Sequence, residues 1–277
     1  MSRTAPVADA KALFEAYARA KGVRIHGLDR PSAERLYSRT LRFVSGFAVG
    51  GKLLDVGCGS GWLAYLFALR GFDAHGIDLN PAAFEVSGIP NLFLREGSGA
   101  EIPYADGSFD IVLANTVLEH MPDPGTVMRE MCRVTRPGGL VMVTGPNLIA
   151  IGPSLAGLFR CWSHRPLLEL FFRHQGMPWF PFGTTIPERL GILAGNCCRW
   201  LRKLGSRSPL FEFRRPDLCP PFHADNDAIY LCNPLDVTRF LSEAGFRVLR
   251  DVDLGRPRLT LFLAGGTWVA ARAPERQ

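Results

Sequence analysis

The sequence predicts an α/β protein with a doubly wound, mostly parallel sheet, and three observations lead to this prediction. Short apolar runs alternate with helical segments between residues 53 and 144, the first run leads into a glycine-rich turn, and a further helix–strand unit closes the chain. Strands that alternate with helices of this length form βαβ units, in which the strands are parallel. The 277 residues are enough for one such domain with an elaboration.

Residues 1–46 are expected to form N-terminal helices. Leu13 and Tyr17 recur at helical spacing, and the segment Ala33–Phe43 repeats the pattern. Asp9 and Glu15 interrupt any apolar core of a signal peptide. We therefore expect a cytoplasmic protein.

The segment 47–147 is expected to be the α/β core. Its expected strands are Leu53–Val56, Ala74–Ile77, Leu92–Leu94, Phe109–Ala114 and Leu140–Thr144, and its expected helices are Trp62–Leu69 and Pro124–Val134.

Residues 231–277 are expected to complete this core. Asn233 and Pro234 are typical of a helix start, Gly245 is typical of a helix end, and a strand is expected over Phe246–Val252. The runs 259–263 and 267–271 can form a hairpin or one broken strand.

The turn after the first expected strand contains Gly57, Gly59 and Gly61, and such glycines let a backbone approach a ligand closely. A dinucleotide-binding turn, G-x-G-x-x-G, would require glycine at position 62, which is Trp62. Asp55 lies two residues before the first glycine. Its carboxylate would repel a pyrophosphate but attract a ligand that carries an ammonium and a sulfonium group.

The segment Leu53–Leu63 resembles motif I of the class I S-adenosylmethionine (SAM)-dependent methyltransferases of the type 11-like group. The resemblance continues through Gly145, with Ser108-Phe109-Asp110 and Arg136-Pro137-Gly138-Gly139 at the family spacing, and resumes from Asn233. It implies SAM as the cofactor and a Rossmann-like methyltransferase fold, with a seven-stranded sheet and a helical insertion after the fifth strand.

The resemblance also implies a set of cofactor-binding residues. They are Asp55, Gly57, Cys58, Gly59, Gly61, Asp78, Leu79, Ser98, Gly99, Ala100 and Asn115. Asp78 follows Asp55 by 23 residues and would accept both ribose hydroxyls. Asn115 matches a position that touches the methionine part of SAM, although a loop-capping role is the alternative.

Ser98 departs from the family pattern, which often has an aspartate that binds the adenine amino group at this position. The Ser98 hydroxyl, or the backbone of Gly99 and Ala100, would then have to hold the adenine.

His120 and His223 are the candidate catalytic bases. Methyl transfer from SAM depends mainly on alignment of the reacting atoms, and a base is needed only for a hydroxyl or a protonated amine. His120 follows the fourth strand, where the chain enters the cleft, although a structural role in the loop is the alternative. His223 begins a segment, 223–230, that loosely resembles methyltransferases of bacterial surface-glycan pathways.

No metal site is expected. The seven cysteines form no C-x-x-C pair, which speaks against a disulfide framework or a structural zinc site. The segment Thr116–His120 is similar to that of ubiquinone-pathway O-methyltransferases, whose Glu-x-x-Glu-His has been proposed as a metal site. Thr116 replaces the first carboxylate, which leaves too few hard ligands for Mg²⁺.

Residues 148–230 are expected to form a lid or substrate-binding insertion, since they are too many for an ordinary connection. Between residues 148 and 222, ten Arg/Lys residues stand against four Asp/Glu residues, and many aromatic residues lie among them. This composition favours an anionic acceptor and peripheral membrane contact through 148–222. A helical subdomain with its own small core is the alternative.

The sequence therefore predicts O-methylation of a small-molecule, lipid-linked or glycan acceptor. The Asn/Asp-Pro-Pro-Tyr signature of DNA and glutamine methyltransferases does not occur, and no nucleic-acid partner is expected because no recognition motif accompanies the basic residues. The alternatives are N- or C-methylation and a non-catalytic SAM-binding regulator.

Overall fold

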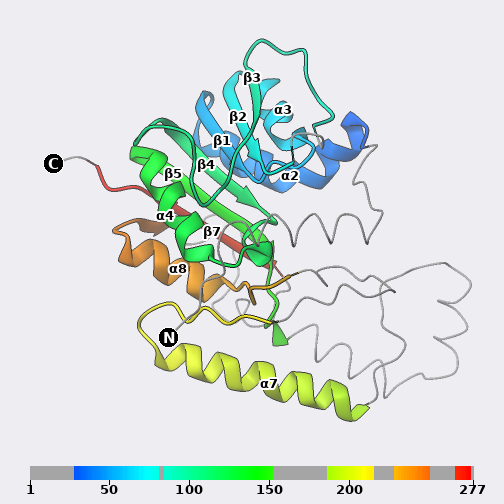
Figure 1. The fold of residues 1–277 in the computed structure, drawn as a ribbon, viewed down its shortest axis with the longest axis vertical. Helices are drawn as coiled ribbons and strands as arrows, with labels where there is room; N and C mark the ends of the chain where they lie inside the picture. The colour runs from blue at the N-terminus through cyan, green and yellow to red at the C-terminus, as the bar shows by residue number, and fades with distance from the viewer. Residues whose placement is uncertain (1–27, 81–83, 152–185, 215–227, 250–265, 276–277) are drawn as a thin grey trace, which may run out of the picture.

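The computed structural model describes residues 28–80, 84–151, 186–214, 228–249 and 266–275. The strands are β1 (Gly51–Val56), β2 (Phe72–Asp78), β3 (Leu92–Glu96), β4 (Phe109–Asn115), β5 (Thr135–Pro146), β6 (Arg247–Leu249) and β7 (Gly266–Arg272). They form one sheet in the order β3-β2-β1-β4-β5-β7-β6, in which β1 to β5 are parallel and β7 is antiparallel to both of its neighbours (Figure 1). The predicted seven-stranded, mostly parallel sheet is confirmed.

Both faces of the sheet are buried, and the strand β4 shows how the sequence brings this about. Ile111 and Leu113 pack into the core on one face, whereas Val112 and Ala114 pack into the core on the other. A strand that is buried on both sides reads as a continuous apolar run, which is the pattern that predicted these strands.

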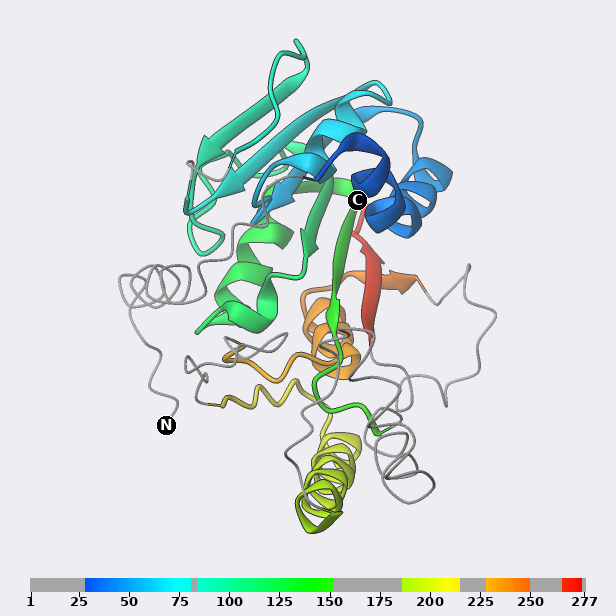
Figure 2. The same cartoon turned by 90° about the vertical axis from the view of Figure 1, so that its right-hand side faces the viewer.

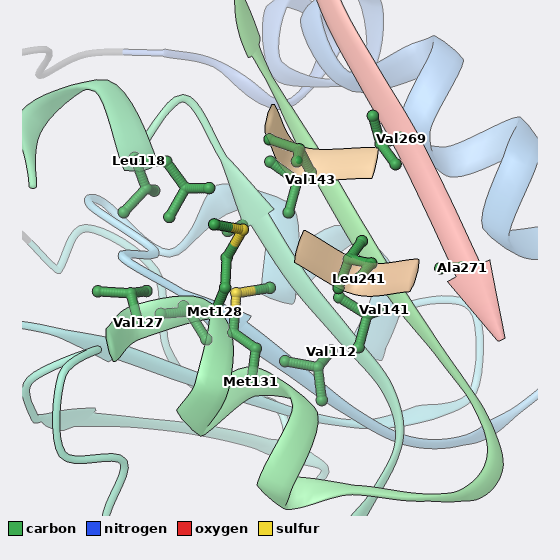
Figure 3. Close-up of a cluster of buried hydrophobic side chains, with 14 of the residues drawn as sticks. Val112, Leu118, Val127, Met128, Met131, Val141, Val143, Leu241, Val269 and Ala271 are labelled. Atoms are coloured by element: carbon green, nitrogen blue, oxygen red, sulfur yellow. The ribbon is translucent and has the colours of Figure 1, made fainter. Parts of the chain in front are cut away.

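Helices cover the two faces in pairs (Figures 1 and 2). The helices α2 (Arg30–Phe47) and α3 (Trp62–Ala68) pack on one face, and α4 (Pro124–Val134) and α8 (Pro234–Glu243) pack on the other. On the second face, Met128 and Met131 of α4 and Leu241 of α8 meet side chains of β4, β5 and β7 (Figure 3). The sheet is therefore doubly wound, as predicted.

Side-chain caps determine where three of these helices begin. The carboxylates of Asp29 and Asp123 and the amide oxygen of Asn233 each accept a hydrogen bond from a backbone N–H in the first turn of α2, α4 and α8, respectively. A proline follows each cap in the first turn, where its missing N–H costs nothing.

The helix α7 (Ile186–Gly205) belongs to the insertion after β5 and lies apart from the sheet, beyond α8 (Figure 1). Trp200 of α7 is buried, and its indole N–H donates to the carbonyl oxygen of Ile149 at 2.8 Å. The insertion thus packs against the C-terminal part of the chain through a small apolar cluster of Ile149, Trp200 and Leu231, the last of which belongs to residues 231–277. Within the described residues, no helix is long and apolar enough to cross a membrane.

Some expected element bounds differ from the observed ones by a few residues. The helix α3 ends at Ala68, β3 extends to Glu96, and β6 covers only Arg247–Leu249. The segment 267–271 lies in the single strand β7, whereas 259–263 lies outside the described residues, as do 8–27 and most of the insertion.

Candidate functional site

The glycine-rich turn, residues 57–61, joins β1 to α3 at the carboxyl end of the sheet. The backbone N–H groups of Gly57 and Cys58 both donate to the carbonyl oxygen of Ile77, at 2.8 and 3.0 Å. These bonds hold the turn across the end of the neighbouring strand β2. In open parallel sheets, ligands bind at this edge, beside the strand where the order of connection reverses, and β1 is that strand here.

Two glycines of the turn meet different constraints. A Cβ atom on Gly57 would lie 2.7 Å from Cγ2 of Val117, so glycine lets the turn pack against the loop that follows β4. Gly59 has φ +54°, and a Cβ atom there would have no atom within 4 Å. The backbone at Gly59 therefore borders open space, as a ligand cradle requires.

Asp78 at the end of β2 is bonded to this turn. Its Oδ2 accepts from the backbone N–H of Gly59, and its Oδ1 accepts from the backbone N–H of Asn80, both at 2.9 Å. A carboxylate has about four acceptor sites, so both oxygens keep capacity for a further donor. The half-buried Asp78 can thus hold the turn and at the same time bind the two hydroxyls of a diol.

Asp55 lies beneath the turn and is only 2% exposed. Burial, and then the charge of Asp78, raise the pKa of Asp55 to about 8. With no ligand present, the carboxyl group is therefore mostly neutral at pH 7. A cationic group bound close by would lower this pKa and stabilise the carboxylate.

Tyr37 of α2 is a neighbour of this site that the sequence analysis missed. Burial raises the pKa of Tyr37 to about 12, with further contributions from the charges of Asp55 and Cys58. Tyr37 shares one helix face with the buried residues Ala33 and Leu41. This spacing of three and four residues is the signal that places Tyr37 against the sheet.

The predicted adenine-binding loop, residues 97–100, adjoins Asp78 and β1. The backbone N–H of Gly97 donates to the carbonyl oxygen of Asp78 at 3.0 Å. A Cβ atom on Gly99 would lie 3.0 Å from Cγ1 of Val56. The Ser98 hydroxyl accepts from the N–H of Ala100 at 3.2 Å, so it shapes the loop.

The carboxyl ends of β4 and β5 meet at Asn115 and Thr144. The Thr144 hydroxyl donates to Oδ1 of Asn115 at 2.6 Å, and Nδ2 of Asn115 makes a long contact of 3.4 Å with the Thr116 hydroxyl. Asn115 therefore has partners on both sides, which hold its side chain at the carboxyl ends of β4 and β5. Thr116 is exposed and has φ +58°, and it is the only non-glycine residue with a positive φ in the described part of the chain.

His120 ends the short 3-10 helix Leu118–His120 that follows Thr116. Its Nε2 lies 3.7 Å from Oε1 of the buried Glu119. The carbonyl oxygen of Glu119 accepts from the N–H groups of Ile229 and Tyr230, so the end of the insertion is attached beside His120. His223, the other predicted base, lies outside the described residues.

The structure thus brings most of the predicted site residues to one edge of the sheet. Asp55, Gly57, Cys58, Gly59, Gly61, Asp78, Leu79, Ser98, Gly99, Ala100, Asn115 and His120 all lie at or just beyond the carboxyl ends of β1 to β4. In the described residues there is no group of three or more His, Cys, Asp or Glu side chains that could hold a metal ion.

Comparison with known proteins identifies a matching family. A family model described as "Methyltransferase domain" matches residues 54–143, which include the second half of β1, all of β2 to β4 and most of β5. An uncharacterized methyltransferase of Mycobacterium tuberculosis (strain ATCC 25177 / H37Ra) is 43% identical over 177 residues, which cover 61% of this chain and 67% of that protein.

Two further similarities involve a shorter sequence match and a solved structure. An uncharacterized methyltransferase of Mycobacterium sp. (strain JLS) is 41% identical over 97 residues, and the match spans only 38% of its length and 34% of this chain. A crystal structure from Listeria monocytogenes, named as an S-adenosylmethionine dependent methyltransferase, has a TM-score of 0.52 at 12% identity. It covers 88% of this chain and 100% of the Listeria chain, and it shows similarity of fold alone.

Proposed function

The chain belongs to the class I SAM-dependent methyltransferases, and we propose that it transfers a methyl group to an oxygen atom of a small-molecule, lipid-linked or glycan acceptor. One observation carries this proposal: the backbone N–H of Gly59 donates a hydrogen bond to the carboxylate of Asp78, next to the buried Asp55.

The residues at this edge of the sheet fit SAM. The backbone at Gly59 borders open space, and Asp78 keeps acceptor sites for two hydroxyls of a ribose. Asp55 is a buried carboxyl group without a cationic partner among the described residues, so a ligand with an ammonium or sulfonium group would compensate its charge. When bound, SAM supplies an activated methyl group.

The chain's own contribution to the reaction is mainly orientation. The glycine turn and Asp78 would hold the nucleoside, and Asp55 and Asn115 would orient the amino-acid part, so that the methyl group faces the cleft. His120 would take the proton of an acceptor hydroxyl. The carboxylate of Glu119, 3.7 Å away, would stabilise the resulting imidazolium.

The surroundings of the cleft support an acceptor that is anionic or attached to a lipid. The insertion is attached beside His120 through Glu119 and follows β5, which also ends at this edge. Its sequence has the local excess of basic residues. N- or C-methylation would use the same SAM-binding residues, and a non-catalytic regulator would need only those residues.

We further propose that the protein acts in the cytoplasm. In the described part of the chain, five cysteines are free thiols, a state that a reducing compartment maintains.

The proposal is tested by incubating the protein and SAM with pools of glycolipids, lipid-linked precursors and soluble metabolites. Mass spectrometry should detect an added methyl group in one pool, together with S-adenosylhomocysteine. His120→Ala should reduce this turnover while leaving SAM affinity unchanged. SAM binding without turnover in any pool would favour the regulator instead.

A further inference from the structure

One face of the helix α7 is fixed to the rest of the protein. Asn196, Trp200 and Lys203 are buried, and they follow one another at helical spacing. Nδ2 of Asn196 and Nε1 of Trp200 donate to the carbonyl oxygens of Ala150 and Ile149, at 3.3 and 2.8 Å. This buried face fixes the orientation of the rest of α7.

A flank of α7, roughly 100° around the helix axis from the buried face, exposes large apolar side chains. Leu190, Leu201 and Leu204 are 47%, 70% and 51% exposed, and their positions fall on one stripe of the helix. Ala194 and Cys198, which are also exposed, lie along the same side. We call Leu190, Leu201 and Leu204 the leucine stripe. A soluble helix normally places leucines at this spacing toward its core, so their exposure needs a partner.

Basic residues outnumber acidic ones around the leucine stripe. From residue 188 to residue 212 the sequence has five Arg or Lys residues, with Glu188 and Glu212 at the two ends. Arg202 and Arg207 are exposed, whereas Lys203 is buried. Glu212 contacts Arg199 and Arg202 at 3.5 and 3.0 Å. The exposed surface is therefore both apolar and basic.

The leucine stripe also lies at the end of the molecule toward which β5 runs. Ile149 and Ala150, which bind α7, follow β5 by only a few residues. Figures 1 and 2 show α7 on the side toward which β5 runs, away from α2 and α3. A surface that bound the leucine stripe would thus lie near the cleft.

We propose that the leucine stripe of α7 docks the protein on an anionic membrane surface. Leucines inserted among lipid headgroups would lose their contact with water, while Arg207 would meet lipid phosphates. This inference rests on the proposed lipid-linked acceptor, because docking would bring the cleft to a substrate held in the membrane.

The test uses the full chain and vesicles made of phosphatidylcholine alone or of phosphatidylcholine with phosphatidylglycerol. Sedimentation should show binding to the anionic vesicles that weakens as salt is raised, since salt screens the arginine–phosphate attraction. No preference for the anionic vesicles would overturn the proposal. SAM affinity, measured separately by calorimetry, tests the methyltransferase assignment and should be the same with or without vesicles.

Leucine variants locate the surface. Leu201→Gln and Leu204→Gln should each lower the partition coefficient about tenfold, because each removes one apolar side chain from the lipid contact. Leu36→Gln is the matched control, since Leu36 is 61% exposed on α2, on the other side of the sheet. Equal losses in Leu36→Gln and Leu201→Gln would overturn the assignment to α7.

Charge variants and the oligomeric state complete the test. Arg207→Gln should reduce binding to anionic vesicles about fivefold and leave binding to neutral vesicles unchanged. Arg30→Gln on α2 should change neither. If Leu201→Gln instead converts a dimer to a monomer without changing vesicle binding, the leucine stripe is an interface between two copies of the chain and the proposal is wrong.

Discussion

Lys203 of α7 and Asp236 of α8 form a fully buried ion pair, with 2.7 Å between Nζ and Oδ2. Asp236 also accepts hydrogen bonds from Nδ2 of Asn233, the hydroxyl of Tyr230 and the backbone N–H of Leu210. A buried carboxylate with this many donors is well compensated. The pair therefore joins the insertion to the α/β core at a defined position.

Removing one partner of this pair should destabilise the protein strongly. Lys203→Met leaves the Asp236 carboxylate buried without its counter-charge, and the free energy of unfolding should fall by about 3–5 kcal/mol. Urea denaturation measures this change. Arg202→Met, which removes an exposed partner of Glu212, should cost less than about 1 kcal/mol. Similar losses of unfolding free energy in both variants would show that the buried ion pair of Lys203 stabilises the protein no more than an exposed one.

The fold was predictable because its signals are local and repeated. Each central strand is an apolar run, and each of α2, α4 and α8 starts at a capping residue followed by proline. Lys203 was not predictable in the same way. Its sequence neighbours are charged or exposed, and only the position of Asp236, 33 residues later, makes burial of Lys203 possible.

The site could be predicted only in part, for a related reason. The glycine turn and Asp78 are recognisable from their spacing, because they belong to one βαβ unit. Tyr37 lies near Asp55 only because of where α2 packs against the sheet, which the local sequence does not show. The positive φ of Thr116 could not be predicted either, because threonine rarely adopts this backbone conformation. Burial of Lys203, a basic residue of the insertion, is likewise a feature that its charge does not predict.

Asp78→Ala should weaken SAM binding. The variant loses the acceptors for the ribose hydroxyls and for the N–H of Gly59. The binding free energy of SAM should therefore weaken by about 1–3 kcal/mol. Isothermal titration calorimetry measures this directly. Asp73→Ala, which removes an exposed carboxylate of the same strand, is the control and should leave affinity unchanged. Unchanged affinity in Asp78→Ala would contradict the assigned role.

The raised pKa of Asp55 should make both stability and SAM affinity depend on pH. In the unfolded chain Asp55 loses its proton near pH 3.8, the ordinary pKa of an aspartate, whereas the folded chain keeps the proton up to about pH 8. The contribution of Asp55 to stability is therefore greatest below pH 4 and is lost as the pH rises toward 8. Asp55→Asn should remove this slope in urea denaturation measured across the same range.

SAM affinity should change in the opposite direction. A cationic ligand favours the Asp55 carboxylate, so binding should release a proton and should tighten between about pH 6 and pH 8, by at most about tenfold per pH unit. Calorimetry in buffers of different ionisation enthalpy would detect the released proton. Proton release that persists in Asp55→Asn would assign the effect to another group.

Chelation should leave the protein's activity unchanged. Thr116 interrupts the carboxylate pattern that would bind Mg²⁺, and orientation of SAM by Asp78 and Asp55 needs no metal. Turnover of an identified acceptor should be the same with and without a chelator. Activity that is abolished by chelation and restored by Mg²⁺ or Zn²⁺ would reveal ligands from outside the described residues.

Replacing Thr116 with glycine should raise the stability of the protein and lower its methyltransferase activity. A β-branched residue at φ +58° costs about 1–2 kcal/mol, and such strain persists in proteins mainly at functional sites. Thr116→Gly relieves the strain but adds chain entropy to the unfolded state, so the free energy of unfolding should rise by no more than about 1 kcal/mol. Methyl transfer should fall if the strained backbone orients Thr116 toward the acceptor.

A second variant separates the strain from the hydroxyl group. Thr116→Val keeps the β-branched shape and the strain, so it should not stabilise the protein, but it removes the hydroxyl that contacts Asn115. If the hydroxyl binds the acceptor, Thr116→Val should raise KM more than it lowers kcat, and Thr116→Ser should restore KM. SAM affinity should be the same in all three variants. Full turnover in Thr116→Gly together with a gain in stability would mean that the strained backbone at Thr116 does not contribute to methyl transfer.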